Sequence, residues 1–252
     1  MVHSSLAALG LAQVPREDPL LYPGAWPRDS GLLDGDRLLP LDRLVYDDRA
    51  PVLAVGSNAC PGQLRHKLDE FGVTSPVPMV RARVTGVDVG VSAHVSRMGY
   101  VSASPVRSPA RMRDLFVLWL DPEQLAVIDA SEGVPLPHGN FARRWLPAPD
   151  VRVELTDGRL LPGVYSYVNR HGVLHGTSRA PRRHPGQRAL LSELVRVSAR
   201  LRELFGATPE EFCTRARADA GLCARGTRLF AEENLVTTSG LERYAPAGRP
   251  RP

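Results

Sequence analysis

Residues 51–64, PVLAVGSNACPGQL, begin with an apolar run and then change character abruptly. Val52 to Val55 have the composition of a short buried strand, and Gly56-Ser57-Asn58 follows at once. The Pro-Gly pair and the QLRHKLDEFG segment that starts just after it have the spacing of a helix. A small polar turn at this place is either a plain connection or a loop whose backbone N–H groups bind an anion. Neither a Walker loop nor GxGxxG is present, so a nucleotide site is not indicated.

The composition is that of an ordinary globular protein. The chain has 252 residues, 43% hydrophobic and 23% charged, which suits one large domain or one domain with extensions. Its 23 prolines and 22 glycines predict many turns rather than a helical bundle. The net charge is +5, but the arginines are interleaved with acids, and the densest basic run, residues 179–188, has no aromatic side chain for base stacking. We therefore expect no nucleic-acid partner.

The cysteines and the apolar segments bear on the compartment. Cys60, Cys213 and Cys223 are odd in number and far apart, and no CxxC occurs. This pattern argues against a disulfide framework or a cysteine-rich zinc site and favours a reducing compartment. The apolar run near the N-terminus lacks a basic region before it, and no stretch approaches the roughly 18 apolar residues of a membrane span. The expectation is a cytoplasmic protein with no membrane partner.

Strand signals dominate the middle of the chain. Residues 1–50 are predicted to be an irregular arm with short helical pieces, and residues 51–170 carry several segments of alternating apolar residues. TDGR at 156–159 has the sequence of a hairpin turn, in which Asp157-Gly158 accepts positive φ angles. We therefore expect residues 151–155 to pair with residues 160–168.

Helices are expected in two places. LDPEQLAVIDASEG (120–133) has Asp121 as N-cap, Pro122 at the first helical position, Gln124 in the capping-box position and Gly133 at the end. Residues 187–235 are predicted to be helical, with a second helix beginning at TPEEF and a frayed tail at the end of the chain. An apolar stripe in the first part is either helix-pair packing or the surface of a homodimer: Leu190, Leu194, Val197, Leu201 and Leu204. The fold class is therefore α+β, with a strand-rich, barrel-like core followed by helices.

Glu132 is the first candidate for chemistry. It stands at the last turn of the helix predicted over 122–131, where the helix dipole disfavours an anion. We expect this to raise its pKa toward the operating pH, as suits a general base. The alternative is a tolerated surface acid, since the dipole effect is worth only about 0.3–1 kcal/mol.

The other candidates have weaker signals. His171 and His175 have the H-x3-H spacing of a zinc pair, but the glycines beside them indicate a loop, so we expect no metal. Cys60 is either a nucleophile near a helix start or a buried inert thiol. Ser57 is not in a G-x-S-x-G motif, which argues against a serine hydrolase. Tyr165 and Tyr167 alternate on one strand, so both face the same side. Aromatic core packing is the default interpretation for such a pair, and the alternative is that one of them points into the pocket, for which we assign Tyr165.

Taken together, these segments resemble the γ-glutamylcyclotransferase-like superfamily. Members have a YGSN loop and an L-x-x-L/I-D-x-x-E-G segment, and this chain has VGSN at 55–58 and LAVIDASEG at 125–133, followed by the DG hairpin and VYSYV. The resemblance covers about residues 51–170. It implies a small mixed β-barrel with flanking helices at 51–180, after the arm of residues 1–50 and before a helical C-terminal extension at 181–252.

The resemblance also implies a reaction that needs no cofactor. Val55, Gly56, Ser57 and Asn58 would be the substrate loop, and Glu132 the general acid/base. A small γ-glutamyl amide would lose its amine when its own α-amine attacks the γ-carbonyl, which releases 5-oxoproline. The two alternatives are an amide hydrolase and a non-catalytic binding module on the same fold.

The chain departs from the family pattern at two places. Val55 replaces the usual tyrosine of the loop, which removes a ring and a hydroxyl from the pocket rim. Where a later tyrosine is common in the family, this chain has Gln187 or Arg188. These differences imply a modified substrate or a changed role.

Overall fold

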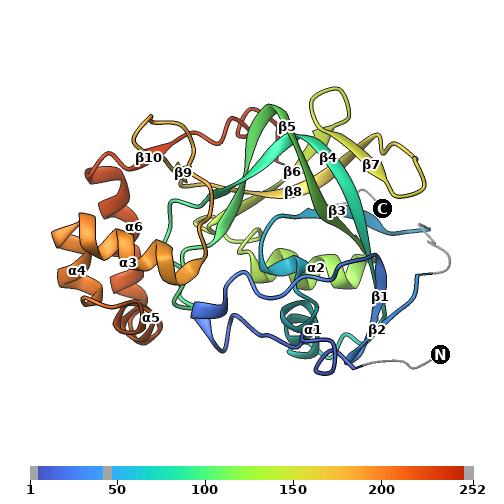
Figure 1. The fold of residues 1–252 in the computed structure, drawn as a ribbon, viewed down its shortest axis with the longest axis horizontal. Helices are drawn as coiled ribbons and strands as arrows, with labels where there is room; N and C mark the ends of the chain where they lie inside the picture. Colours follow the sequence, from blue (N-terminus) through green and yellow to red (C-terminus); the bar gives the residue numbers. More distant parts are fainter. Residues whose placement is uncertain (1–4, 42–46, 247–252) are drawn as a thin grey trace.

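The computed structural model describes residues 5–41 and 47–246. Figure 1 shows these residues as a twisted sheet with two helices on one side and a group of helices at one end. The two helices beside the sheet are α1 (Pro61–Asp69) and α2 (Pro122–Ser131). The terminal group consists of α3 (Gln187–Val197), α4 (Ala199–Phe205), α5 (Pro209–Ala218) and α6 (Ala220–Glu232). The α+β class predicted from the sequence is confirmed.

The main sheet has mixed strand directions. Its members are β1 (Gly31–Asp34), β2 (Arg37–Leu39), β3 (Ala50–Ala54), β4 (Val77–Val91), β5 (Ala103–Leu120), β6 (Phe141–Pro147), β7 (Arg152–Leu155) and β8 (Gly163–Asn169). The hydrogen-bonded order is β2-β1-β4-β5-β3-β8-β6, and β7 pairs with β4 beside this path. β3 and β8 run parallel, whereas β3 and β5 run antiparallel. The described strands do not close on themselves, so the predicted barrel is not confirmed.

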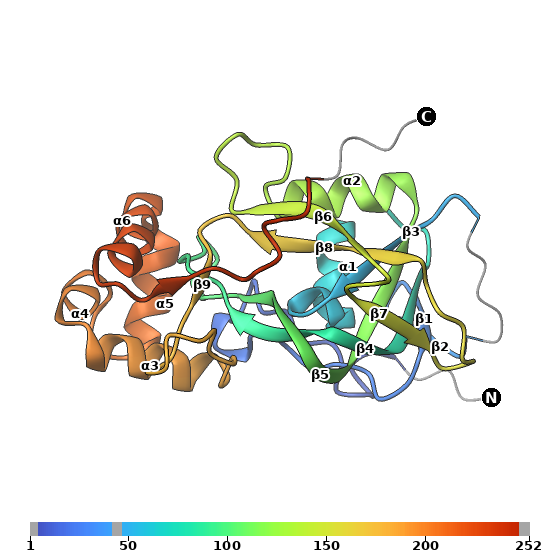
Figure 2. The ribbon, with the colours of Figure 1, turned by 90° about the horizontal axis from the view of Figure 1, so that it is seen from above.

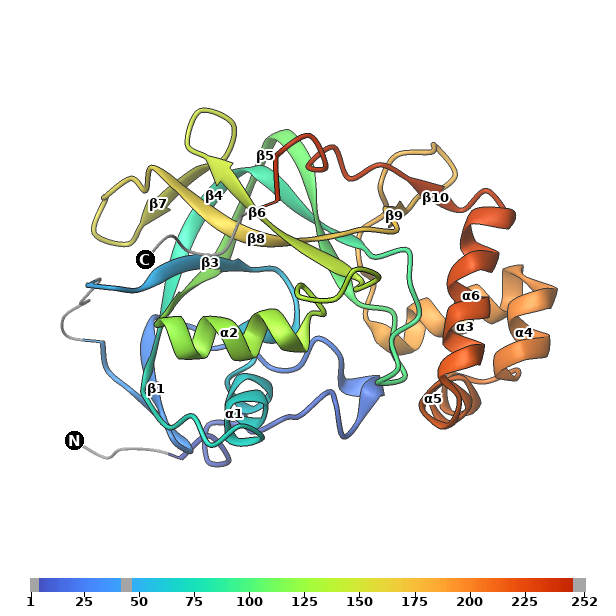
Figure 3. The same cartoon turned by 180° about the vertical axis from the view of Figure 1, so that it is seen from behind.

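Strand β3 is buried on both faces, as its unbroken apolar sequence predicts. Val52 and Ala54 pack into the cluster that includes the apolar side chains of α1 and α2. Leu53 and the following Val55 pack into a second cluster on the other face of the sheet. Figure 3 shows α2 lying along the sheet below β3. The Gly56–Asn58 turn therefore directly follows a strand that is buried in the core.

The N-terminal arm contains two strands that the sequence reading missed. β1 and β2 form an antiparallel hairpin, and β1 continues the sheet by pairing with β4 through Gly31, Leu32 and Leu33. A 3-10 helix, η1 (Pro19–Leu21), is the short helical piece that was expected in this arm. The arm is thus part of the sheet rather than irregular throughout.

The pairing predicted around TDGR is only partly correct. Gly158 has φ +83°, and Leu155 and Gly158 close the turn through backbone hydrogen bonds. Beyond a bridge between Glu154 and Leu160, however, β7 pairs with β4, and β8 pairs with β6 and β3. Pro162 has no N–H to donate to a ladder, and its carbonyl instead accepts from Ala148, so the chain turns away there.

Helix α2 confirms its predicted signals in full. The Asp121 side chain accepts from the N–H of Gln124, the Gln124 side chain returns a bond to the backbone of Asp121, and Gly133 ends the helix with φ +73°. The same capping box is present at Thr208 and Glu211, where α5 begins. These are local hydrogen bonds between residues three apart, which is why the sequence predicts them well.

The leucine stripe predicted over residues 190–204 belongs to two helices. α3 ends at Val197, and Ser198 is the N-cap of α4, with its hydroxyl accepting from the N–H of Leu201 at 3.0 Å. Val197 is consequently 55% exposed, whereas Leu190 and Leu201 are fully buried. These leucines pack with aromatic side chains of α4, α5 and α6 in a third apolar cluster. Figure 2 shows this group of helices beside the sheet.

Two short strands connect the helical group to the sheet. β9 (Val173–Leu174) and β10 (Val236–Thr237) pair antiparallel. No helix in the described ranges is long and apolar enough to cross a membrane. The predicted frayed tail includes residues 247–252, which lie outside the described residues, and the division into three segments at 50 and 180 stays a prediction.

Replacing Ser198 by Ala tests the helix break. The change removes the N-cap bond to Leu201 and the bond to Glu233, which the hydroxyl donates at 2.9 Å. We expect the free energy of unfolding, measured by urea denaturation, to fall by about 1–2 kcal/mol. The exposed loop residue Ser178 serves as a control, and Ser178→Ala should change stability little. Equal stability of Ser198→Ala and the wild type would contradict this role.

Candidate active site

A cavity of about 710 Å³ opens where the arm, the turn after β3, the end of α2 and helix α6 meet. The predicted loop residues Val55, Gly56, Ser57 and Asn58 all line it, and so does Glu132. Two signals 74 residues apart in the sequence are therefore brought to one wall. The volume is within the usual range for small-molecule sites.

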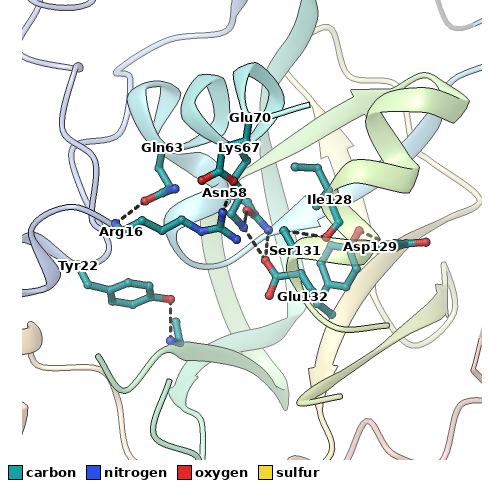
Figure 4. A network of polar contacts seen from close by, with 12 residues as sticks. Arg16, Tyr22, Asn58, Gln63, Lys67, Glu70, Ile128, Asp129, Ser131 and Glu132 are labelled. Atoms are coloured by element: carbon teal, nitrogen blue, oxygen red, sulfur yellow. Dashed lines mark hydrogen bonds and ion pairs between the residues drawn. The ribbon is translucent and has the colours of Figure 1, made fainter. Parts of the chain in front are cut away.

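Glu132 is fixed at the cavity by its place after α2. It is the C-cap residue of the helix, and its side chain is 16% exposed. Its Oε1 accepts a hydrogen bond from Asn58 Nδ2 at 3.1 Å, as Figure 4 shows. Asn58 belongs to the 3-10 turn η2 (Ser57–Ala59), so the loop and the helix end are directly bonded.

Lys67 completes this contact, and the sequence reading missed it. Its Nζ lies 2.8 Å from Glu132 Oε1 and 2.7 Å from Asn58 Oδ1, and its side chain is only 3% exposed. Lys67 comes from α1, the helix that starts directly after the loop. It is the chain's one lysine, and an isolated lysine just downstream of a ligand loop is the signal that would have drawn attention to it.

The predicted rise in the pKa of Glu132 is wrong in direction. Burial raises the pKa of Glu132, but the charge of Lys67 and the hydrogen bonds from Lys67 and Asn58 lower it by more than this rise. The pKa therefore lies below its ordinary value. The expectation considered only the dipole of α2 and left out the positive charge of Lys67, which α1 supplies. Glu132 is therefore an ionised carboxylate at neutral pH, held in one orientation.

Tyr165 does not line the cavity, contrary to its assignment. Its ring packs against Trp145 at 4.9 Å and below Arg143 at 5.0 Å. Tyr167 lines the cavity instead, with its hydroxyl donating to Asp129 at 2.9 Å. Both residues face the same side of β8, as predicted, but two residues along a strand span about 6.5 Å. Only the later one reaches the edge where the turn after β3 lies.

Two further tyrosines stand at the cavity wall. Tyr22, from the arm, and Tyr100, between β4 and β5, pack with ring centroids 4.6 Å apart. The Tyr22 hydroxyl accepts a hydrogen bond from the N–H of Ala103 at 2.8 Å. Tyr22 comes from a segment before the region that resembles the family, whereas Tyr100 lies within it, and both rings supply aromatic surface to the cavity wall.

The residues expected in place of a later tyrosine are not at the cavity. Gln187 is buried, and its side-chain amide faces the backbone of Val101. Arg188 pairs with Glu210 at 2.6 Å on the exposed side of the helical group. Their position at the start of α3 turns them away from the site.

His94 is another cavity residue that carried no sequence signal. Asn169 accepts the N–H of His171 through Oδ1 at 2.9 Å, so its Nδ2 is the group that donates to His94 Nδ1 at 2.8 Å. The ring proton of His94 is thereby assigned to Nε2. Burial, with a smaller contribution from His171, lowers the pKa of His94 to about 3. The ring stays neutral at physiological pH.

Of the remaining candidates, His171 lines the cavity, whereas His175 and Cys60 do not. His171 Nε2 contacts Asn140 at 3.1 Å, whereas both nitrogens of His175 face backbone carbonyls, so the two do not form a pair. The Cys60 thiol donates to the carbonyl of Gln13 at 3.2 Å, and burial raises its pKa. This is the environment of the inert buried thiol rather than of a nucleophile.

Comparisons with known proteins give fold likenesses at low identity. No family model matches the chain, and no curated protein does. Among solved structures, a protein described as gamma-glutamyl cyclotransferase is 17% identical, with a TM-score of 0.35, over 48% of this chain and 66% of that one. An Arabidopsis thaliana protein is 16% identical, with a TM-score of 0.37, over 63% and 89%. YkqA from Bacillus subtilis is 14% identical, with a TM-score of 0.35, over 76% and 56%.

The first of these structures has the name of the family that the sequence motifs resemble. The chain spans slightly less than two thirds of that protein's length. At these TM-scores the likeness carries no weight for the site, whose assignment rests on its own geometry.

Gly56 and Tyr22 are expected to be energetically coupled. A Cβ at position 56 would collide with the Tyr22 hydroxyl, whereas its next contacts, including the Tyr22 ring carbon, are at 3.4 Å. Gly56→Ala should therefore destabilise the wild type by about 1–3 kcal/mol. In a Tyr22→Phe background, which lacks the hydroxyl, the same change should cost less. Thermal and urea unfolding of the four proteins measure this coupling, and strict additivity would contradict the contact.

His94 should make stability depend on acidity. In the unfolded chain His94 has its ordinary pKa of about 6.5. Between this pH and about pH 3, the unfolded state therefore binds a proton on His94 that the folded state does not bind. This contribution to stability is complete above about pH 6.5 and is lost as the pH falls toward 3. Between about pH 6 and 4, the wild-type free energy of unfolding should fall by about 1.4 kcal/mol per pH unit more than that of His94→Gln. Parallel pH profiles would contradict the assignment.

Proposed function

We propose that this protein is a γ-glutamylcyclotransferase-like enzyme, which releases 5-oxoproline and a free amine from a small γ-glutamyl amide. The observation that carries the proposal is the bond between Glu132 and Asn58. It places an ionised carboxylate on the same cavity wall as the turn after the buried strand. A general base and a loop able to bind a carbonyl oxygen are the two groups that this reaction needs.

In the proposed reaction the substrate supplies its own nucleophile. Glu132 accepts a proton from the α-ammonium group, and the free amine attacks the γ-carbonyl carbon. A new C–N bond closes the five-membered ring, and the C–N bond to the leaving amine breaks. Glu132 passes this proton to the leaving nitrogen, then takes a second proton from the ring nitrogen after the attack and passes it on in the same way. The lactam thus keeps one N–H, the amine departs as an ammonium ion, and Glu132 is again a carboxylate. Attack within one bound molecule profits from high effective molarity.

The ion pair with Lys67 suits this exchange of a proton. Lys67 contacts Oε1 of Glu132, and Oε1 also accepts from Asn58, which together fix one oxygen and leave Oε2 as the oxygen for the substrate. Because the pKa of Glu132 is lowered, its protonated form is a good acid toward the leaving amine. The N–H of Asn58 lies in the first turn of η2 and has no acceptor within that turn. It supports the role of an oxyanion donor, whereas the Ser57 N–H already donates to the Tyr22 hydroxyl.

Glu132→Gln tests the mechanism. Gln keeps the shape and the contact with Asn58 but cannot take up the proton, so 5-oxoproline release from a panel of γ-glutamyl amides should fall by about 100-fold or more. The matched control is Glu123→Gln, an exposed position on the same helix, which should retain full rate. Chromatography that separates 5-oxoproline from glutamate gives the readout, and thermal unfolding checks that each variant folds.

The same assay separates the alternatives. Free glutamate in place of 5-oxoproline would identify an amide hydrolase. Binding of γ-glutamyl amides without turnover of any member of the panel would identify a non-catalytic module. A Glu132→Gln protein that keeps the wild-type rate of 5-oxoproline release would refute the assigned base.

A further inference from the structure

The N-terminal arm brings a guanidinium group to the cavity. Arg16 lines the cavity together with Lys67 and Glu132, and its side chain is 12% exposed. Figure 4 shows it extending from the arm toward the Asn58–Lys67–Glu132 contact. No motif of the sequence pointed to Arg16, because it lies well before the segments that resemble the family.

Two neighbours hold Arg16 in place. Its backbone N–H donates to Gln63 Oε1 at 2.8 Å, and its Nη1 donates to Glu70 Oε2 at 2.7 Å. Gln63 and Glu70 both come from the α1 region, so the arm is tied to the helix that also carries Lys67. The planar guanidinium is thus oriented in advance, which reduces the entropy lost when it binds a ligand.

Arg16 keeps donor capacity after these contacts. Its Nε is buried and has no hydrogen-bond partner among the described residues. Lys67, by contrast, is occupied by Glu132 and Asn58. Arg16 also has partners, since Glu70 accepts from its Nη1 and the Tyr100 hydroxyl hydrogen-bonds to its side chain. Of the two cations beside Glu132, however, Arg16 is the one with an unused donor, its Nε.

The charges of the cavity wall favour a ligand with an anionic group. Glu132 is the only Asp or Glu among the described residues that line it, whereas four Arg or Lys residues do: Arg16, Lys67, Arg97 and Arg228. Arg97 and Arg228 are exposed. Arg16 lies close enough to Glu132 for its charge to lower the pKa of that carboxyl. A cation and a carboxylate side by side match the two charged groups of an α-amino acid.

We propose that Arg16 binds the α-carboxylate of the glutamyl group, while Glu132 faces the α-ammonium on the same carbon. The inference rests on the proposed function, since it assigns one end of the same substrate. It makes Arg16 a specificity-determining residue, supplied by a segment outside the family motifs. Ligands that lack a free α-carboxylate are disfavoured because they leave the buried Nε of Arg16 without an acceptor.

Binding of two matched probes tests this inference without requiring turnover. L-Glutamate and its α-amide, L-isoglutamine, differ in the α-carboxylate alone, and neither has a γ-amide to cleave. In calorimetric titrations the wild type should bind L-glutamate about 10- to 100-fold more tightly than L-isoglutamine. Arg16→Gln should bind both probes equally and weakly.

The control is Arg65→Gln, on α1. Arg65 pairs with Asp69 at 3.3 Å and does not line the cavity, so its loss should leave the discrimination intact. Should Arg16→Gln fail to fold, Arg16→Lys keeps a charge beside Glu70 but loses the planar fork, and its discrimination should fall below that of the wild type. A wild type that does not distinguish the probes, or an Arg16 variant that still does, overturns the inference.

Steady-state kinetics separate this inference from the proposed reaction. With a γ-glutamyl substrate, Arg16→Gln should raise KM about tenfold or more and change kcat little, whereas Glu132→Gln should lower kcat. Release of 5-oxoproline with an unchanged KM in Arg16→Gln refutes the role of Arg16 alone. Discrimination between the probes without any 5-oxoproline release refutes the reaction alone.

Discussion

The contact among Lys67, Asn58 and Glu132 is the constraint on which the site depends. It joins the middle of α1, the turn after β3 and the end of α2 through three short polar contacts. Two opposite charges removed from water are costly unless they meet in good geometry with their remaining bonds satisfied. Loss of either charge would leave the other buried without an opposite charge. The contact therefore fixes the relative positions of the three elements more than it adds to the net free energy of unfolding.

This contact also changes the chemistry of the carboxylate. A glutamate at a helix C-terminus would by itself be a destabilised anion. Beside Lys67 it is a stabilised one. The cavity wall also contains Arg16 and the rings of Tyr22 and Tyr100, and under the proposed function this surrounding would suit a ligand that carries a negative charge.

Segments outside the region of family resemblance form much of this wall. The arm supplies Arg16 and Tyr22, and α6 borders the outer part of the cavity. The Tyr22 hydroxyl accepts a hydrogen bond from the N–H of Ala103, the first residue of β5. This bond fixes the arm against β5 and holds Tyr22 at the cavity. The replacement of the usual loop tyrosine by Val55 therefore accompanies a pocket whose rim is built from other parts of the chain.

The sequence by itself determined what local interactions control. The turn after the buried strand, the capped helix at 122–131 and the position of Glu132 at its end all depend on residues within a few positions of one another, and all are found as predicted. The motifs also predicted that this turn and Glu132 would share a site. Hydrogen bonds between residues three apart need no knowledge of the rest of the chain.

Only the tertiary structure decided which distant groups complete the site. Arg16 and His94 carry no local signal of their role, and the isolated Lys67 does not reveal its partners. The choice between Tyr165 and Tyr167 depends on where a neighbouring strand ends. The direction of the Glu132 pKa shift likewise depends on the position of Lys67, which lies on a different helix. Charge interactions and strand pairing depend on distances in space, and those distances are set by packing between segments that are far apart in the sequence.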